Sequence, residues 1–523
     1  MADAKRLIPT LVVVLAILAG VHAIDASPLG VFYDDAHYAI LARALAFGDG
    51  YRYVNLPGAP VATHFPPGYA AFLAVLWRIA PDFPENVALF KMANAALLGG
   101  VALATFVLAR RRFGLGLLPA ALAALAGTVT IPALVLASGV MSETLFLALL
   151  VPLLLAAEKG SETDGIKTAA WLGVGAGAMA LVRSHAVVLI VALAVSYVLR
   201  RRTREAVVSA GAGLLVIAPW LIWVQHFDPL MPEPVRGQYG SYGAWLMEGL
   251  RADGVGLLWA ALRDNTVTGL AIIARSFSLT RHVVFDTLAV LAVFTLGAVG
   301  AAECWRRSWV LLLFLAFYLA MTLLWPFSPL RFVWGVWPLL MLLMVSGAVW
   351  LWRVGESVRG ARLVARTACV VAGSIALTGA LVFNVRGYAN AWWATVSRSR
   401  QPSIQPTLAW VAERTNRDDV IIADDDGAVY LYTGRRALPA AAFTARQHFR
   451  PRAVAENAAD MAQMMNAFTP DYVVVLSAGT REAAQALAAA NPPLLQPLDT
   501  ILGGRVFRVT GAKATRPAAA RRP

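Results

Sequence analysis

Two adjacent carboxylates, Asp34 and Asp35, stand in the first polar segment of the chain, which reads VFYDDAHYAILARALAFGDG over residues 31–50. Neighbouring carboxylates repel each other when both are ionised, so the pKa of one of them is raised. A carboxylate with a raised pKa is suited to act as a general base. The apolar residues that follow recur at intervals of three and four, which predicts an amphipathic helix with Asp34 as its N-cap. Capping and proton abstraction are both open for this pair.

Further polar residues stand beside prolines or at the ends of apolar runs. His64 and Tyr69 flank the paired prolines of THFPPGY, and Glu143, Arg183 and Arg331 each begin or end an apolar run. Taken singly, each is explained as well by a rigid turn or by a side chain that reaches the membrane surface. Together they could line one cavity with carboxylates opposite guanidinium groups. Guanidinium groups bind phosphate through paired donors, so such a cavity suits a phosphate with an apolar tail.

A metal site is the weaker alternative for these polar residues. The seven histidines fall at or beyond one predicted membrane boundary, but their spacing matches no known ligand pattern. We therefore expect no cofactor, with a divalent metal as the alternative. The run DDDG over residues 424–427 lacks the rest of a calcium loop and predicts a turn from a strand into a helix. Cys304 and Cys369 are too few for a disulfide framework, and the chain contains neither a Rossmann fingerprint nor a phosphate-binding loop.

The composition indicates which elements must position these residues. Of 523 residues, 59% are hydrophobic and only 15% are charged, with a mean hydropathy of +0.63. Soluble domains carry about a quarter charged residues. We therefore predict a mainly α-helical, polytopic membrane protein. Apolar windows suited to crossing a bilayer number about eleven, at residues 7–24, 87–108, 116–138, 142–157, 168–183, 185–199, 206–225, 283–301, 308–325, 332–352 and 363–384.

Basic residues between these windows predict how the chain is threaded. With a cytoplasmic N-terminus, the short outer loops contain only Arg183 and Arg331. This asymmetry fixes the orientation and accounts for much of the net charge of +14, so no nucleic-acid surface is expected. The basic residues of the cytoplasmic side are Lys5, Arg6, Arg110, Arg111, Arg112, Lys159, Lys167, Arg200, Arg201, Arg202, Arg204, Arg306, Arg307, Arg353, Arg359, Arg362 and Arg366.

Three long segments then face outward from the cytoplasmic (inner) membrane: residues 25–86, residues 226–282 and everything after about residue 385. The first is predicted to carry amphipathic helices and the second to be a large loop. The first apolar run also resembles a signal peptide with a cleavage site at residues 21–23, and either outcome leaves residue 25 outside.

The outward segment after residue 385 differs from the membrane domain, residues 1–385. It alternates helix-like stretches with β-branched runs, which predicts a small extracytoplasmic α/β domain over residues 386–510. Residues 511–523, rich in Ala, Arg and Pro, are predicted to be disordered. The helix-like stretches are 405–414, 453–465 and 481–490, and the β-branched runs are 420–423, 472–476 and 506–509.

Taken in order along the chain, these motifs resemble the polytopic GT-C glycosyltransferases, in particular the phospholipid carrier-dependent group that contains protein O-mannosyltransferases and the aminoarabinose transferases of lipid A. The resemblance covers most of the membrane part. The motifs that carry it are the acidic pair followed by YAILAR, the PPGY turn, MSE opening a span, LVR at residues 181–183, APW at residues 218–220, the prolines before Arg331, and WVAERT at residues 410–415.

This resemblance implies transfer of a sugar from a polyprenyl-phosphate donor to an acceptor, with inversion, at the outer face of the membrane. The acceptor is a protein, a lipid or a glycan. The base that deprotonates it falls on Asp34 or Asp35, where the family more often has Asp-Glu. Arg331, assisted by Arg183 or Lys91, would hold the donor phosphate. The other residues of the implied donor site are Glu143, which would orient Arg183 or the sugar, His64, where many relatives carry a basic residue, and Tyr69.

Three other functions compete with this interpretation. A lipid-linked saccharide transporter or flippase would place charges in mid-span and break helices in matching halves. A membrane-anchored sensor would not need so many spans. A lipid-carrier polysaccharide ligase would be expected to centre on a late outer loop, whereas the acidic pair lies in the first.

Overall fold

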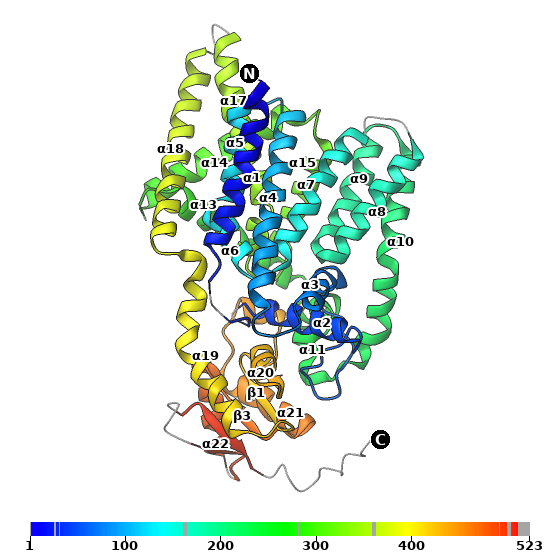
Figure 1. Cartoon of the computed structure of the whole chain (residues 1–523), viewed down its shortest axis with the longest axis vertical. Helices are drawn as coiled ribbons and strands as arrows, with labels where there is room; N and C mark the ends of the chain where they lie inside the picture. Colours follow the sequence, from blue (N-terminus) through cyan, green and yellow to red (C-terminus); the bar gives the residue numbers. More distant parts are fainter. Residues whose placement is uncertain are drawn as a thin grey trace.

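The structure is a computed structural model that describes residues 2–25, 28–30, 32–160, 165–280, 282–357, 362–490, 492–498 and 504–510. The tail predicted to be disordered, residues 511–523, lies outside this part. Most of the chain is helical, and the strands form one small sheet near the C-terminus (Figure 1). The prediction of a mainly α-helical membrane fold with a C-terminal α/β domain is confirmed.

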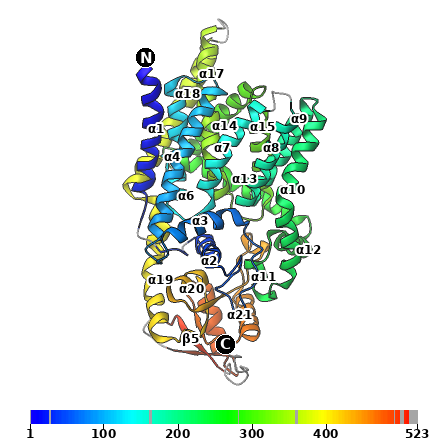
Figure 2. The same ribbon diagram turned by 45° about the vertical axis from the view of Figure 1, so that its right-hand side comes forward.

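Long apolar helices form a bundle that makes up one end of the molecule (Figures 1 and 2). Every one of the predicted spans coincides with an apolar helix or with a pair of consecutive helices. The window 116–138, for example, is a pair bent by 49°. The helices of the bundle are α1 (Ala2–His22), α4 (Val87–Arg111), α5 (Leu117–Thr128), α6 (Ile131–Ser138), α7 (Ser142–Gly160), α8 (Ile166–Val182), α9 (Val187–Leu199), α10 (Thr203–Phe227), α14 (Val283–Cys304), α15 (Trp309–Leu324), α16 (Leu330–Trp334), α17 (Trp337–Ser357) and α18 (Arg362–Ala389).

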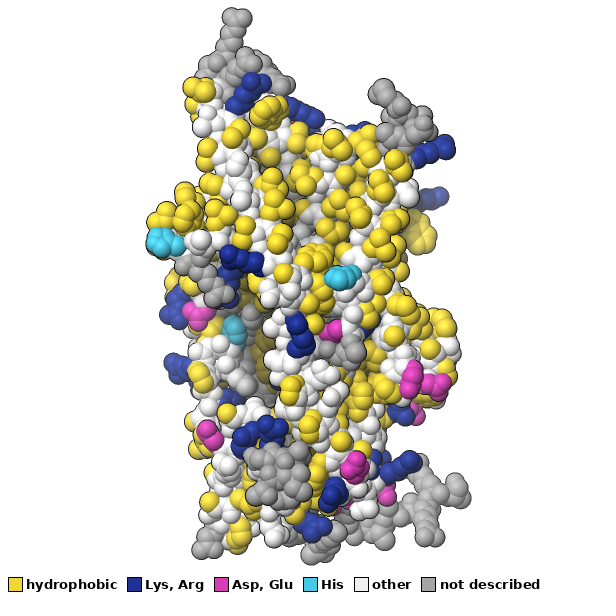
Figure 3. All heavy atoms as spheres, turned by 60° about the vertical axis from the view of Figure 1, so that its left-hand side comes forward, with side chains coloured by type: hydrophobic (Ala, Val, Ile, Leu, Met, Phe, Trp, Pro, Cys, Tyr) yellow, Lys and Arg dark blue, Asp and Glu magenta, His cyan; other side chains and the backbone are white. Residues whose placement is uncertain are grey.

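The bundle has the surface and the packing of a multi-pass membrane protein. Within the described residues, four helices are long and apolar enough to cross a membrane, or five if the bent pair is one span. Hydrophobic side chains cover the face of the bundle that Figure 3 shows, and Lys and Arg side chains lie near the end of the bundle away from the C-terminal domain. Helices α14 and α17 touch through their backbones, because a Cβ on Gly300 would lie 2.0 Å from the Leu343 carbonyl oxygen. Small residues permit such close approach between membrane helices.

Most of the segments predicted to share one side lie together at the opposite end, whereas residues 256–277 lie beside the bundle helices (Figure 1). Residues 25–86 contain α2 (Asp34–Phe47) and α3 (Pro67–Ile79). The second segment, 226–282, predicted as a large outer loop between two spans, is largely helical. It folds into α11 (Glu233–Tyr239), α12 (Tyr242–Asp253) and α13 (Gly256–Phe277). The α13 helix packs against α14, α15 and α18, because its face with Leu257, Ala261, Ile272 and Phe277 is apolar and buried.

The C-terminal domain contains a five-stranded sheet with the order β2-β1-β3-β5-β4. The first three strands are parallel to one another, and β5 and β4 are antiparallel to their neighbours. Two predicted strands match β1 and β5, and the acidic turn leads from β1 into α20 as predicted. The sequence interpretation missed β2 and β4. The elements are α19 (Thr395–Arg414), β1 (Val420–Ala423), α20 (Asp426–Thr433), β2 (Arg436–Pro439), α21 (Val454–Phe468), β3 (Tyr472–Val474), α22 (Ala478–Ala488), β4 (Leu495–Pro497) and β5 (Val506–Val509).

Helix α20 of this domain lies directly against α2. A Cβ on Gly427 would stand 2.8 Å from the Cβ of Ala36, so the two helices approach at a residue without a side chain. Along the same contact, the Tyr432 hydroxyl accepts a hydrogen bond from the backbone N–H of Leu29 at 2.9 Å. The C-terminal domain therefore supports the segment that carries the acidic pair.

Candidate active site

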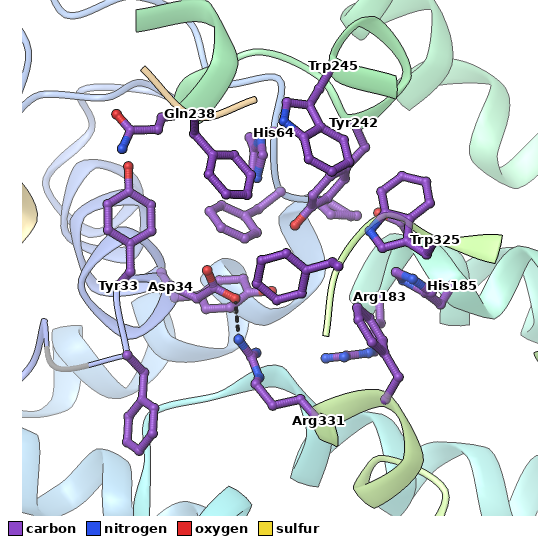
Figure 4. A pocket seen from close by; sticks show the side chains of 18 residues that line it. Tyr33, Asp34, His64, Arg183, His185, Gln238, Tyr242, Trp245, Trp325 and Arg331 are labelled. Atoms are coloured by element: carbon purple, nitrogen blue, oxygen red, sulfur yellow. Dashed lines mark hydrogen bonds and ion pairs between the residues drawn. The ribbon is translucent and has the colours of Figure 1, made fainter. Parts of the chain in front are cut away.

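A cavity of about 280 Å³ lies where the end of the bundle, the first outer segment and the C-terminal domain meet (Figure 4). Three charged side chains line it, Asp34, Arg183 and Arg331, and much of the remaining wall is aromatic. The lining residues are Phe32, Tyr33, Asp34, Tyr38, His64, Phe65, Pro66, Arg183, Ser184, His185, Gln238, Tyr242, Trp245, Trp325, Phe327, Arg331, Phe332 and Phe443.

The turn that begins α2 gives the two members of the acidic pair different environments. The prediction that Asp34 is the N-cap of this helix is wrong. Tyr33 holds the N-cap position, with φ 65° and ψ −62°, and its side chain makes no capping hydrogen bond. The Asp35 carboxylate turns into the protein and accepts hydrogen bonds from the backbone N–H groups of Phe32, at 3.2 Å, and Ala36, at 3.0 Å. Burial raises the pKa of Asp35 to about 6. Asp34, by contrast, faces the cavity.

A chain of charged contacts joins Asp34 to both arginines. Its carboxylate lies 2.9 Å from Nη1 of Arg331. Arg331 also donates to Oε1 of Glu143, at 3.0 Å from Nη2 and 3.2 Å from Nε. Glu143 is fully buried and lies 3.0 Å from Nη1 of Arg183. A buried carboxylate is stable only with its charge paired, and here two guanidinium groups supply the pairing.

Breaks between helices bring these residues together. Glu143 stands in the first turn of α7, Arg183 follows the last residue of α8 with extended backbone, and Arg331 lies in the short helix α16 after Pro329. The Ser142 hydroxyl links this cluster to α2, because it accepts hydrogen bonds from Arg183 at 3.1 Å and from the Tyr38 hydroxyl at 3.2 Å. The prediction that span ends at one depth converge therefore agrees with the geometry.

Besides Asp35, three of the residues implied by the resemblance lie outside the cavity. Glu143 stands behind its wall, in contact with both arginines. Tyr69 is buried with its ring edge-on to Tyr38, at a centroid distance of 4.8 Å. Lys91 is buried and pairs with Asp25 at 2.7 Å. The cluster at the cavity thus contains neither Tyr69 nor Lys91.

His64 lines the cavity, as predicted for a residue near the acidic pair. Its Nδ1 lies 2.5 Å from the carbonyl oxygen of Gly240. Burial lowers the pKa of His64, which favours the neutral imidazole at neutral pH. Because Nδ1–H donates to the Gly240 carbonyl, the neutral ring can accept a hydrogen bond from a ligand at Nε2 but carries little positive charge. Within the described residues, no group of three or more His, Cys, Asp or Glu side chains could hold a metal ion.

The aromatic residues of the cavity were missed in the sequence. They come from the first outer segment, from α12, from the turn after α15, from α16 and, in the case of Phe443, from the C-terminal domain. The one available signal was the density of aromatic residues in two outer stretches, residues 239–245 and 325–327.

Comparisons with known proteins bear on the fold. No protein-family model matches the sequence, and no curated protein matches it. Two solved structures of ArnT from Cupriavidus metallidurans are similar. The apo structure has a TM-score of 0.52 and 15% identity, covering 97% of this chain and 98% of that chain. The structure bound to undecaprenyl phosphate has a TM-score of 0.48 and 18% identity, covering 97% of this chain and 99% of that chain. The chain has an ArnT-like fold.

Proposed function

Starting from a fold shared with ArnT, an aminoarabinose transferase of the GT-C type, we propose that the protein is a membrane glycosyltransferase. It moves a sugar from a polyprenyl-phosphate donor to an acceptor hydroxyl, with inversion at the anomeric carbon. The observation that carries the proposal is the pairing of Asp34 with Arg331, at 2.9 Å, in a cavity that a second guanidinium, that of Arg183, also lines.

Each charged residue has a role in this reaction. Asp34 removes the proton from the acceptor hydroxyl as its oxygen forms a bond to the anomeric carbon. The bond between that carbon and the phosphate oxygen breaks, and the phosphate leaves with the electron pair. Arg331 and Arg183 stabilise the charge on the leaving phosphate. Attack on the face opposite the phosphate inverts the anomeric centre, and no nucleotide or phosphate loop is needed because the donor is already activated.

Arg331 can couple binding of the donor to the action of the general base, because the donor phosphate and Asp34 both use its guanidinium. Its guanidinium donates to Asp34 on one side and to Glu143 on the other. A phosphate that binds Arg331 competes with Asp34 for the same N–H groups, and thereby frees the carboxylate beside the reacting carbon. Glu143, which is fully buried, keeps the opposite edge of the guanidinium in place.

The size and place of the cavity suit the polar head of such a donor. Its volume of about 280 Å³ is near the lower end of small-molecule sites, roughly 300–1,000 Å³. A sugar and a phosphate fit this space, and the polyprenyl chain must lie outside it, along the apolar bundle. The positive-inside rule supports an orientation with this end of the molecule at the outer face of the cytoplasmic membrane and the N-terminus in the cytoplasm.

The test uses the full-length protein in proteoliposomes with radiolabelled polyprenyl-phosphate sugars and a panel of protein, lipid and glycan acceptors. We expect wild type to transfer label, Asp34→Asn to bind donor but lose transfer by about 10²–10⁴-fold, and Arg331→Gln to lose donor binding. Glu85→Gln, an exposed carboxylate of the same segment, is the matched control and should behave as wild type. Movement of the lipid-linked sugar across the membrane without transfer would contradict the proposal in favour of a flippase.

A further inference from the structure

The wall of the cavity that faces Asp34 and Arg331 is aromatic (Figure 4). Trp325 lies at its centre, with ring centroids at 5.6 Å from Trp245, 5.9 Å from Tyr242 and 5.7 Å from His185. These side chains come from separate parts of the chain, and Phe443 of the C-terminal domain stacks on Trp245 at 5.3 Å. The wall is thus a built feature of the fold and not a run of neighbouring residues.

Several polar groups on this wall have no hydrogen-bond partner within the described residues, among them the buried indole N–H of Trp245 and Nε2 of His185. Neither the Tyr242 hydroxyl nor the Trp325 indole N–H makes a hydrogen bond to any residue in the described ranges. Both side chains line the cavity, and a polar group at such a surface is satisfied by water or by a ligand. The indole is a donor only, so its ligand partner must be an oxygen or nitrogen with a free lone pair.

The combination of aromatic faces with unpartnered donors defines the chemistry of the ligand. Aromatic faces cover the C–H groups of a sugar ring, and its hydroxyl oxygens accept hydrogen bonds from the N–H and O–H donors. An ammonium group has no lone pair for the Trp325 indole. The cavity is lined by two guanidinium groups, those of Arg183 and Arg331, and by one carboxylate, that of Asp34, so its net positive charge disfavours an ammonium group on the sugar.

We propose that the aromatic wall binds the sugar of the donor, and that this sugar is neutral and hydroxylated, without a free amino group. The inference rests on the proposed function, because the phosphate on Arg331 and Arg183 directs the attached ring toward Tyr242 and Trp325. These two residues determine which sugar is accepted, and the acceptor approaches from the side of Asp34.

The test measures binding to the full-length protein in detergent micelles. The probes are sugar-free polyprenyl phosphate and polyprenyl phosphate carrying neutral hexoses and pentoses, each beside its amino-sugar counterpart. Tyr242→Phe and Trp325→Phe remove one donor each and keep the aromatic face. Loss of one hydrogen bond of about 1–1.5 kcal/mol predicts roughly fivefold to tenfold weaker binding of the best neutral donor. Binding of sugar-free polyprenyl phosphate should stay unchanged, which a merely structural defect would not allow. Trp171→Phe, at an exposed tryptophan in the half of α8 that lies away from Arg183, is the control.

The outcomes separate the two proposals. Tighter binding of an amino sugar than of its neutral counterpart would overturn the inference that the donor sugar is neutral. Equal binding by wild type and by both variants would overturn the aromatic subsite, while loss of transfer in Asp34→Asn would still support the glycosyltransferase. If no polyprenyl-phosphate compound binds, the proposed function itself fails.

Discussion

Two acidic turns begin helices that pack against each other, the Asp34–Asp35 turn of α2 and the Asp424–Asp426 turn of α20. In the turn of α20, Asp424 accepts hydrogen bonds from the backbone N–H groups of Leu476 and Ser477, at 2.6 and 2.8 Å. Asp425 pairs with Arg400 at 2.9 Å, and Asp426 accepts a hydrogen bond from the Tyr239 hydroxyl. In the turn of α2, Asp35 likewise has a structural role, because it accepts hydrogen bonds from backbone N–H groups.

Asp34 differs from the other carboxylates of the two turns because it faces the cavity. A raised pKa would select other carboxylates as the general base. Burial is the largest cause that raises the pKa of Asp35 and of Asp425 to about 6, and that of Asp426 to about 7. None of these three carboxylates lines the cavity. A raised pKa therefore marks the structural carboxylates here, whereas contact with a cavity and with a guanidinium marks the proposed base.

The largest effect expected is the contrast between Asp34 and its neighbour. Asp34→Asn should lower transfer by about 10²–10⁴-fold without a change in thermal unfolding. Asp35→Asn should keep most activity, because only one carboxylate oxygen, Oδ1, accepts the two backbone N–H groups and an amide oxygen can replace it. Transfer rates and melting temperatures of both variants check this. A greater loss of transfer in Asp35→Asn would assign the base to the buried carboxylate.

Glu143 extends the comparison, because it is as buried as Asp35 but pairs with two guanidinium groups. Glu143→Gln removes the carboxylate that pairs with Arg183 and leaves Arg331 paired with Asp34 alone, and breaking a buried pair costs about 3–5 kcal/mol. We expect a lower melting temperature together with weaker binding of the donor, measured with polyprenyl phosphate. Glu456→Gln, an exposed carboxylate of α21, is the control. Unchanged binding would show that Glu143 does not position the arginines.

The sequence could predict the convergence of Asp34, Arg183 and Arg331, because charges at span ends of one side share a depth. It could not predict which member of the acidic pair faces the cavity. That choice depends on the positive φ of Tyr33, which is rare outside glycine and is held by tertiary contacts.

The aromatic wall and the packing of α20 against α2 could not be predicted from the sequence for a related reason. Each depends on residues far apart in the chain, such as Phe443 against Trp245 and Gly427 against Ala36. Local patterns in a sequence report periodicity and turns, and they do not report which surfaces of two domains meet. The same limit hid α13, whose buried face was assigned to a loop because charged residues interrupt its apolar run.

Asp426 should give a smaller effect that depends on pH. Its pKa is about 7 in the folded protein, against 3.8 as the ordinary value, so the folded state binds the proton more tightly. Its contribution to stability is therefore present at low pH and is lost as the pH rises from about 4 through 7. Asp426→Asn should flatten the dependence of the melting temperature on pH over this window. A residual slope should remain, because Asp35 and Asp425 shift in the same direction. Parallel curves for wild type and variant would contradict the role of Asp426.

The smallest effect expected tests whether the two turns act on each other through Gly427. Gly427→Ala places a methyl group about 2.8 Å from the Cβ of Ala36, and such overpacking costs about 1–3 kcal/mol. Because Ala36 stands two residues after Asp34, we expect a modest loss of transfer as well as of melting temperature. Gly479→Ala is the matched control, since Gly479 is also the second residue of its helix and a Cβ there meets only Asn457, at 3.5 Å. The double variant Gly427→Ala with Ala36→Gly should recover both properties, and a coupling energy near zero in this cycle would mean that α20 does not position α2 at this contact.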